Sequence, residues 1–249
     1  TEALLRTELE VTVVEQRPHI LPHIADAAVA DTITQRLRQR GVDLLIEDPA
    51  QEIISSGGRA TGVRLASGKT VAADLVVLMV GVRPNINFLA ESGIEMQQGI
   101  LTDRMMRTSA PDVYAVGDMV QFYDPVIKKD MVSALWGNAV HMGRVAGFNM
   151  SGIEAYAPPL LSCLNSTEIA DLPIISAGLL HTRSEQYAIY TETQGENYRK
   201  LIFDEDRLIG MIFLGNVHRA GIYTNLIRNR IPLGDRRNTL IREVMGEIG

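Results

Sequence analysis

The sequence has little of what a disulfide-bonded or metal-clustered protein requires. Its 249 residues include one cysteine, Cys163, and a single thiol can form neither an internal disulfide nor a metal cluster. Such cysteine usage is typical of a reducing compartment, so the cytoplasm is the expected location. We interpret Cys163 itself as a small, buried, apolar side chain.

Strong charge and long apolar runs are lacking as well. The 24 basic and 30 acidic residues give a net charge of −6, with no basic run to attract nucleic acid or an anionic membrane. No apolar stretch reaches the length of a transmembrane helix, and the first residues lack the pattern of a signal peptide. We therefore expect neither nucleic acid nor a membrane among the partners.

What is present is an alternation of strands and helices. Nearly continuous β-branched residues predict a buried strand at residues 9–15. Apolar steps of three and four predict a helix over residues 26–40, which Gly41 would end. Short runs separated by glycine turns predict an antiparallel meander over residues 51–73. Further strands are expected at residues 42–46, 75–80, 113–116, 174–177, 187–192, 198–203 and 208–214, and helices at residues 138–149 and 219–230. This alternation predicts an α/β protein.

Glu15 stands at the end of the first predicted strand. In a dinucleotide-binding βαβ unit, a carboxylate in this place accepts hydrogen bonds from the adenine ribose and would repel a 2′-phosphate, which favours NAD over NADP. Residues 1–8 look like the last turns of a helix, so the glycine-rich phosphate turn would fall before Thr1. The alternative is a solvated carboxylate at a strand end.

The most specific pattern is residues 108–118 (TSAPDVYAVGD). It delivers Asp118 to the carboxyl end of a short strand, where ligands bind in open α/β sheets, and Gly117 removes a side chain beside it. A carboxylate there can accept a hydrogen bond from a polyol such as a ribityl chain. At residues 74–85 (DLVVLMVGVRPN), a second strand end carries Gly81, which permits close approach of the backbone to a ligand.

Residues 108–118 resemble the second FAD motif of the two-dinucleotide-binding-domain flavoproteins, the FAD/NAD(P)-dependent pyridine nucleotide-disulfide oxidoreductase family. Residues 76–85 resemble the hinge between its NAD and FAD domains, and residues 134–150 resemble the helix whose start faces the flavin. Residues 198–216 resemble the last domain of the nitrite-reductase-like and rubredoxin-reductase-like branch. The resemblance implies FAD contacts at Gly117, Asp118, Trp136, Gly137 and Asn138, and NAD contacts at Gly81 and Glu15. It implies no catalytic acid or base, and no residues have the spacing of metal ligands.

The implied fold is α/β, an incomplete two-dinucleotide-binding-domain flavoprotein fold with a small α/β C-terminal domain. Residues 1–84 would be part of the NAD-binding domain, residues 85–153 the second segment of the FAD-binding domain, and residues 154–249 the C-terminal domain. The implied activity is transfer of electrons from NADH through FAD to an acceptor, a small molecule or a redox protein, that the sequence does not identify. Because both glycine motifs of the family precede the position of Thr1, we expect a fragment that binds FAD and NAD weakly or not at all and is inactive alone.

Alternatives remain at the level of function. A disulfide reductase or an NADH oxidase of the same family would use a cysteine in an upstream FAD segment. A redox-inert scaffold or assembly subunit would keep the fold without turnover. The oligomeric state is open, with a homo-oligomer among the alternatives.

Overall fold

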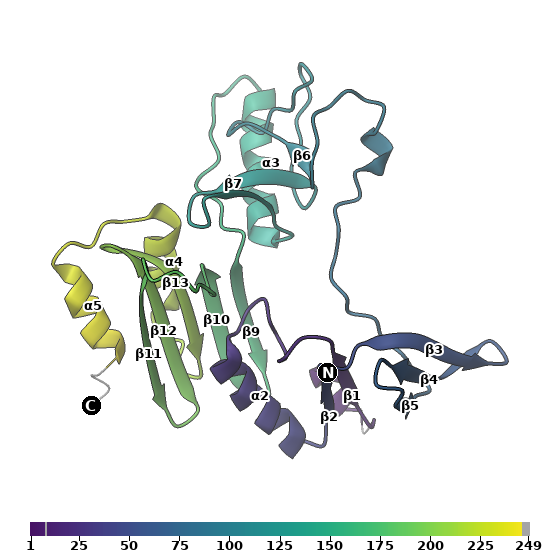
Figure 1. The fold of residues 1–249 in the computed structure, drawn as a ribbon. Coiled ribbons are helices and arrows are strands. Elements are labelled where there is room, and N and C mark those ends of the chain that lie inside the picture. Colours follow the sequence, from purple (N-terminus) through teal and green to yellow (C-terminus); the bar gives the residue numbers. More distant parts are fainter. Residues whose placement is uncertain (8, 246–249) are drawn as a thin grey trace. The chain divides into compact units, whose positions relative to one another are not determined.

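A computed structural model describes residues 1–7 and 9–245, and the chain forms two compact units. Unit 1 comprises Thr1–Val80 and Thr167–Ile174, and unit 2 comprises the remaining described residues. Helices and strands alternate along both (Figure 1), which confirms the predicted α/β class. Among the described residues, no helix combines the length and apolar character needed to cross a membrane.

Unit 1 contains one parallel strand pair. β1 (Thr12–Glu15) pairs with β2 (Asp43–Ile46), and α2 (Ala27–Gln39) connects them. The Asp26 side chain accepts a hydrogen bond from the Val29 N–H at 3.3 Å, which caps the helix. The strands predicted at residues 9–15 and 42–46 and the helix predicted between them are therefore confirmed, the first strand in a shorter form. The predicted helical start is confirmed as α1 (Glu2–Leu5), while Glu8 lies outside the described residues.

The predicted meander in unit 1 is also confirmed. β3 (Ala50–Ser56), β4 (Arg59–Leu65) and β5 (Thr70–Ala72) pair antiparallel in that order. Gly57 and Gly58 both have positive φ values, 59° and 79°. This is the backbone that a tight hairpin turn requires and that glycine adopts without strain.

The strand predicted at residues 75–80 is wrong. This segment has no regular structure, and Met79 and Val80 are each 88% exposed. A buried strand of this apolar type needs partners on its edges and cover on its faces. Within the part of the chain that the structure describes, no strand pairs with it, and all of its side chains except that of Val76 are exposed.

The first part of unit 2 is a small sheet with one long helix. β6 (Ile100–Leu101) runs parallel to β7 (Val120–Asp124), which pairs antiparallel with β8 (Lys129–Val132). A short 3-10 helix, η1 (Asn87–Leu89), precedes them, and α3 (Trp136–Met150) follows. Buried side chains from these elements form one core, including Ile100, Val120, Phe122, Met142 and Val145. The predicted helix at residues 138–149 is confirmed and begins two residues earlier, at Trp136.

The strand predicted at residues 113–116 is wrong as well. Only Tyr114 forms a bridge, to Arg107, and Val113 and Val116 are 40% and 37% exposed. The segment has a pairing partner on one side alone among the described residues, so its backbone does not form a continuous ladder.

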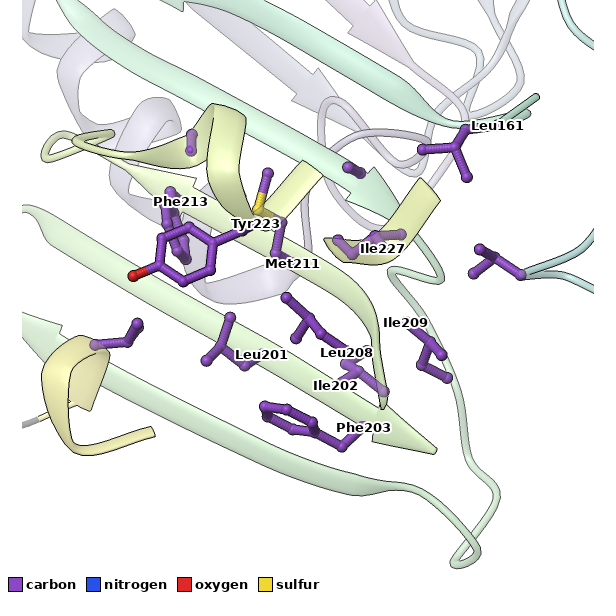
Figure 2. Packing of buried hydrophobic residues seen from close by; sticks show 14 residues of the cluster. Leu161, Leu201, Ile202, Phe203, Leu208, Ile209, Met211, Phe213, Tyr223 and Ile227 are labelled. Atoms are coloured by element: carbon purple, nitrogen blue, oxygen red, sulfur yellow. The ribbon is translucent and has the colours of Figure 1, made fainter. Parts of the chain in front are cut away.

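The C-terminal part of the chain forms a five-stranded sheet of order β11-β12-β13-β10-β9, which belongs to unit 2 except for residues Thr167–Ile174 of β9, β10 and their connection. Its core is apolar, and Figure 2 shows Phe213 lying beside Tyr223, with ring centroids 5.2 Å apart in an edge-to-face contact. The four strands predicted here are confirmed, and β9 is an additional one. The elements are β9 (Leu164–Ile169), β10 (Leu172–Gly178), β11 (Ala188–Gln194), β12 (Asn197–Asp204), β13 (Arg207–Leu214), α4 (Ala220–Asn229) and α5 (Arg236–Met245).

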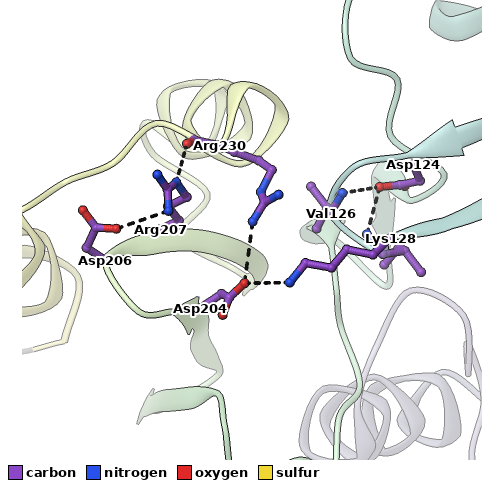
Figure 3. A network of polar contacts seen from close by, with 8 residues as sticks. Asp124, Val126, Lys128, Asp204, Asp206, Arg207 and Arg230 are labelled. Carbon is purple, nitrogen blue, oxygen red and sulfur yellow. Dashed lines mark hydrogen bonds and ion pairs between the residues drawn. The ribbon is translucent and has the colours of Figure 1, made fainter.

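The turn between β7 and β8 joins the two parts of unit 2. Val126 is 4% exposed and lies in the same apolar cluster as Phe203 and Leu208. Beside it, Lys128 Nζ lies 3.1 Å from Asp204 Oδ2, and Arg230 Nη2 lies 3.6 Å from the same oxygen. Figure 3 shows this network together with the Asp124 carboxylate, which accepts hydrogen bonds from the turn.

Candidate functional site

Asp118 lies in the turn that precedes β7, directly after Gly117. Gly117 has φ +84°, a left-handed conformation that glycine adopts easily. Its N–H donates a hydrogen bond to Met142 Sδ at 3.3 Å, and a Cβ at this position would lie 3.9 Å from the Ala139 Cβ. The turn therefore packs on α3 and leaves the Asp118 side chain exposed.

Asp118 lines a cavity of about 960 Å³ within unit 2. This volume lies within the range of small-molecule sites, roughly 300 to 1,000 Å³. The other walls come from residues 82–86, Gln98, Met119, Val132 and Ala134. The hinge-like segment (residues 76–85) and the turn at Gly117 and Asp118 were predicted separately from the sequence, and residues of both line this one cavity.

The polar groups of this cavity are few and differ in chemistry. Arg83 is its single cation among the lining residues, Asp118 its single anion, and Asn85 and Gln98 supply amides. Neither Arg83 nor Asp118 has an ion pair with another described residue. The cavity can therefore offer one guanidinium, one carboxylate and two amides to a ligand.

A buried glutamine fixes one wall of the cavity. Gln121 is 5% exposed, and its Oε1 accepts hydrogen bonds from the N–H of Gln98 at 3.0 Å and of Gly99 at 3.2 Å. Its Nε2 donates to Gln97 Oε1 at 2.9 Å. A Cβ on Gly99 would lie 2.7 Å from the Met119 carbonyl oxygen, so only glycine allows this close approach.

The sequence did not predict Gln98, Gln121, Met119, Val132 or Ala134 as site residues. Near Gln98 the only signal was the glycine of Gln97-Gln98-Gly99, which is compatible with any turn. Ala134 opens the segment 134–150, whose resemblance pointed to the flavin without naming this residue. The role of these residues depends on contacts between segments about 20 residues apart, and a single sequence does not report such contacts.

Three predicted residues at the start of α3 do not line the cavity. Trp136 is 85% exposed and Gly137 is exposed. Asn138 is 6% exposed, and its Nδ2 donates a hydrogen bond to the Leu161 carbonyl oxygen at 2.9 Å. Its amide nitrogen therefore ties α3 to the segment that leads into β9.

The two predicted NAD contacts lie in different units. Gly81 opens unit 2 and precedes the lining residue Val82. Its φ is +90°, and a Cβ there would meet nothing within 4 Å, so backbone conformation rather than crowding favours glycine. Glu15 ends β1 in unit 1, and its Oε1 accepts a hydrogen bond from the Arg17 N–H at 2.9 Å.

Thiolate and metal chemistry find no support in the described residues. Burial, with a smaller effect of the Asp124 charge, raises the pKa of Cys163 to about 11, so the thiol stays protonated at neutral pH. No group of three or more histidine, cysteine or acidic side chains that could hold a metal ion occurs within residues 1–7 and 9–245.

Fold and cavity together define a class of protein. It is an α/β protein with a ligand-sized site between the turn that precedes β7 and the segment at residues 82–86. Residues 1–143 match the family model of the pyridine nucleotide-disulphide oxidoreductases. This match covers more than half of the chain, so the chain belongs to that family. Residues 164–231 match the model of the rubredoxin NAD+ reductase C-terminal domain. The family and the branch inferred from the motifs are thus confirmed.

Similar curated proteins agree with this assignment. Nitrite reductase [NAD(P)H] of Bacillus subtilis is 27% identical over 247 residues, which are 98% of this chain and 30% of that protein. An NADH oxidase of Methanocaldococcus jannaschii is 34% identical over 172 residues, which are 69% of this chain and 38% of the relative. The chain thus spans well under half the length of these two relatives.

Solved structures confirm the fold. The NAD-dependent persulfide reductase of A. fulgidus superposes with a TM-score of 0.82 and 26% identity, over 95% of this chain and 47% of that one. An FAD-dependent pyridine nucleotide-disulphide oxidoreductase of Desulfovibrio vulgaris gives a TM-score of 0.80 at 23% identity, over 95% and 64% of the two chains. The predicted fold, of which this chain spans a part, is confirmed.

Proposed function

We propose that this chain is part of an FAD-dependent oxidoreductase that passes electrons from NADH through the flavin to an acceptor. The observation that carries the proposal is the Asp118 carboxylate on the cavity wall, in a turn that Gly117 makes and α3 supports. When bound, the flavin supplies the redox chemistry, while the protein binds, orients and tunes it.

The residues of the cavity suit a flavin with its ribityl chain. Asp118 has no hydrogen-bond partner among the described residues, so both carboxylate oxygens are available to accept bonds from sugar-alcohol hydroxyls. The amides of Asn85 and Gln98 can donate and accept hydrogen bonds. We assign Gly117 and Asp118 as FAD contacts. Trp136, Gly137 and Asn138 are proposed to place the N-terminus of α3 near the flavin, where the helix dipole favours negative charge.

The electron donor is proposed to be NADH. Glu15 at the end of β1 suits the ribose hydroxyls of NAD and opposes a 2′-phosphate, and Gly81 is the second proposed contact. Two relatives support this by name, since one is an NADH oxidase and another a rubredoxin-NAD(+) reductase of Acinetobacter baylyi. The proposed domains are residues 1–84 for NAD, residues 85–153 for FAD and residues 154–249 for the C-terminal part. The proposed compartment is the cytoplasm.

The acceptor is a small molecule or a redox protein. A relative named for rubredoxin supports a redox protein as the acceptor. A relative named for monodehydroascorbate supports a small molecule. The relative named an NADH oxidase supports the alternative that the protein is an NADH oxidase. Assays of the protein isolated from its source cells separate these alternatives: dye reduction by NADH, oxygen uptake and disulfide reduction. Bound flavin without any NADH-driven turnover would favour a redox-inert scaffold.

The flavin site itself is tested on this chain by equilibrium dialysis against FAD at high concentration. We expect weak binding, because the chain carries no glycine-rich phosphate loop. Asp118→Asn should weaken binding about tenfold, since it removes a charge-assisted hydrogen bond. Asp130→Asn, an exposed change on β8, serves as the matched control. Equal affinities of the two variants would overturn the assignment of Asp118.

A further inference from the structure

The cavity brings two opposite charges to one ligand site. Arg83 and Asp118 both line it, and neither is neutralised by another described residue. We propose that Arg83 binds a phosphate group attached to the polyol whose hydroxyls Asp118 binds, so that the cavity selects flavin phosphates over riboflavin. This inference rests on the proposed function and names the part of the ligand that Arg83 recognises.

Neighbouring residues restrict the backbone conformation at Arg83. The following residue, Pro84, restricts Arg83 to extended conformations, and Gly81 turns the chain two residues earlier with φ +90°. At the other end of the segment, Ile86 packs against the apolar core of β6, β7 and α3. Five successive residues, 82–86, form one cavity wall, which is anchored to the core at its Ile86 end.

The two charges require different parts of a ligand. A guanidinium binds phosphate through two parallel N–H···O bonds, which is the strongest contact it makes with an anion. A carboxylate repels a phosphate, and it accepts hydrogen bonds from neutral hydroxyls. A ligand that satisfies both must therefore carry hydroxyls at one position and an anion at another. A ribityl phosphate has this pattern, and riboflavin lacks its anion.

FMN and riboflavin test the proposal because they differ only in the phosphate. Each is titrated with the chain at physiological ionic strength, with flavin fluorescence anisotropy as the readout. We expect FMN to bind about fivefold more tightly, the ratio that corresponds to a partly exposed charge pair of about 1 kcal/mol. Since the chain carries a net charge of −6, non-specific electrostatics would favour riboflavin instead, so a preference for FMN is informative.

Two variants assign the preference to Arg83. Arg83→Gln should bind FMN and riboflavin equally, and the ³¹P resonance of FMN should no longer shift on addition of protein. Arg144→Gln, a matched change at an exposed position on α3, should keep the full preference. Asp118→Asn should weaken the binding of both flavins, and that of FMN somewhat less, because the lost carboxylate no longer repels its phosphate. Arg83 is exposed, so circular dichroism and thermal unfolding should be unchanged in its variant.

The possible results of these titrations distinguish a failure of this inference from a failure of the proposed flavin site. Equal binding of FMN and riboflavin by the unaltered chain would overturn the role of Arg83 and leave the flavin site in place. The role of Arg83 would also be overturned if the preference for FMN survives in Arg83→Gln, or if it is lost equally in Arg144→Gln. Failure of the chain to bind either flavin even at millimolar concentration would overturn the inference and the weak binding expected of this chain alone.

Discussion

The Asp124 carboxylate accepts two hydrogen bonds from Ser162, one from its N–H at 2.6 Å and one from its hydroxyl at 2.7 Å. Its other oxygen accepts from the N–H groups of Val126 at 2.8 Å and Ile127 at 3.0 Å. Asp124 is fully buried, so these four donors replace its hydration. One side chain thus connects the end of β7, the following turn and the segment before β9.

Asp124→Asn should therefore destabilise unit 2 by about 3 kcal/mol. The amide presents an NH₂ group to two of the four donors, which leaves buried polar groups unpaired. The free energy of unfolding, from urea denaturation, measures the effect. Asp130→Asn, exposed on the neighbouring strand, should change stability by no more than about 0.5 kcal/mol. A similar small change in the Asp124 variant would contradict the role given to this carboxylate.

Cys163 should react slowly with thiol reagents. Burial, assisted by the Asp124 charge, raises the pKa of its thiol from 9.0 to about 11, and only the thiolate is nucleophilic. At pH 8, alkylation by iodoacetamide should be about 100-fold slower than in the urea-unfolded chain, because the thiolate fraction falls in that proportion. The rate should keep rising with pH up to about 11. A rate that levels off near pH 9 in the folded protein would show that the thiol is not perturbed.

Gln121 offers a test of the cavity wall that needs no ligand. Gln121→Leu removes the acceptor of the Gln98 and Gly99 N–H groups, so both amides should exchange with solvent at least tenfold faster in hydrogen-exchange NMR. Gln121→Glu keeps that acceptor and loses only the bond to Gln97, so protection should persist. Equal exchange rates in the two variants would mean that the side chain does not hold this turn.

The Lys128–Asp204 ion pair should contribute little to stability. The two side chains are 48% and 23% exposed, and pairs of this kind contribute about 0.2 to 1 kcal/mol. A double-mutant cycle with Lys128→Gln and Asp204→Asn measures the interaction directly. The coupling energy should shrink in 1 M salt, because the charges are partly open to solvent. A coupling above about 2 kcal/mol would indicate that the pair is better desolvated than its exposure suggests.

Sequence periodicity predicted the elements whose partners lie close by in the chain. The helix at α2 followed from apolar residues three and four apart, Ala27, Ala30, Ile33 and Leu37, the last three of which are buried. β12 and β13 followed from strand-like runs at residues 198–203 and 208–214, which a short turn separates. The two wrong strands, at residues 75–80 and 113–116, were apolar segments of the same kind. Composition makes a segment suitable for a strand, whereas hydrogen bonds to neighbouring strands make it one, and those neighbours cannot be read from the segment itself.

The candidate site was predicted in part for the same reason. Asp118 and the hinge-like segment were identified because each carries a local pattern, a glycine beside an acid and a glycine before Arg83-Pro84. Gln98 and Gln121 carry no such pattern, since their role arises when β7 brings residue 121 against the turn at residue 98. The predicted roles of Trp136, Gly137, Asn138, Gly81 and Glu15 remain predictions.

The insertion of Val126 among Phe203 and Leu208 has a practical consequence for protein engineering. A chimera that exchanges the C-terminal sheet for that of another reductase would separate this valine from the apolar side chains that cover it. The valine side chain would then be exposed to water. Crossover points placed after residue 153 would cut through a shared core. Functional recombinants should instead inherit the β7–β8 hairpin and the C-terminal sheet from the same parent.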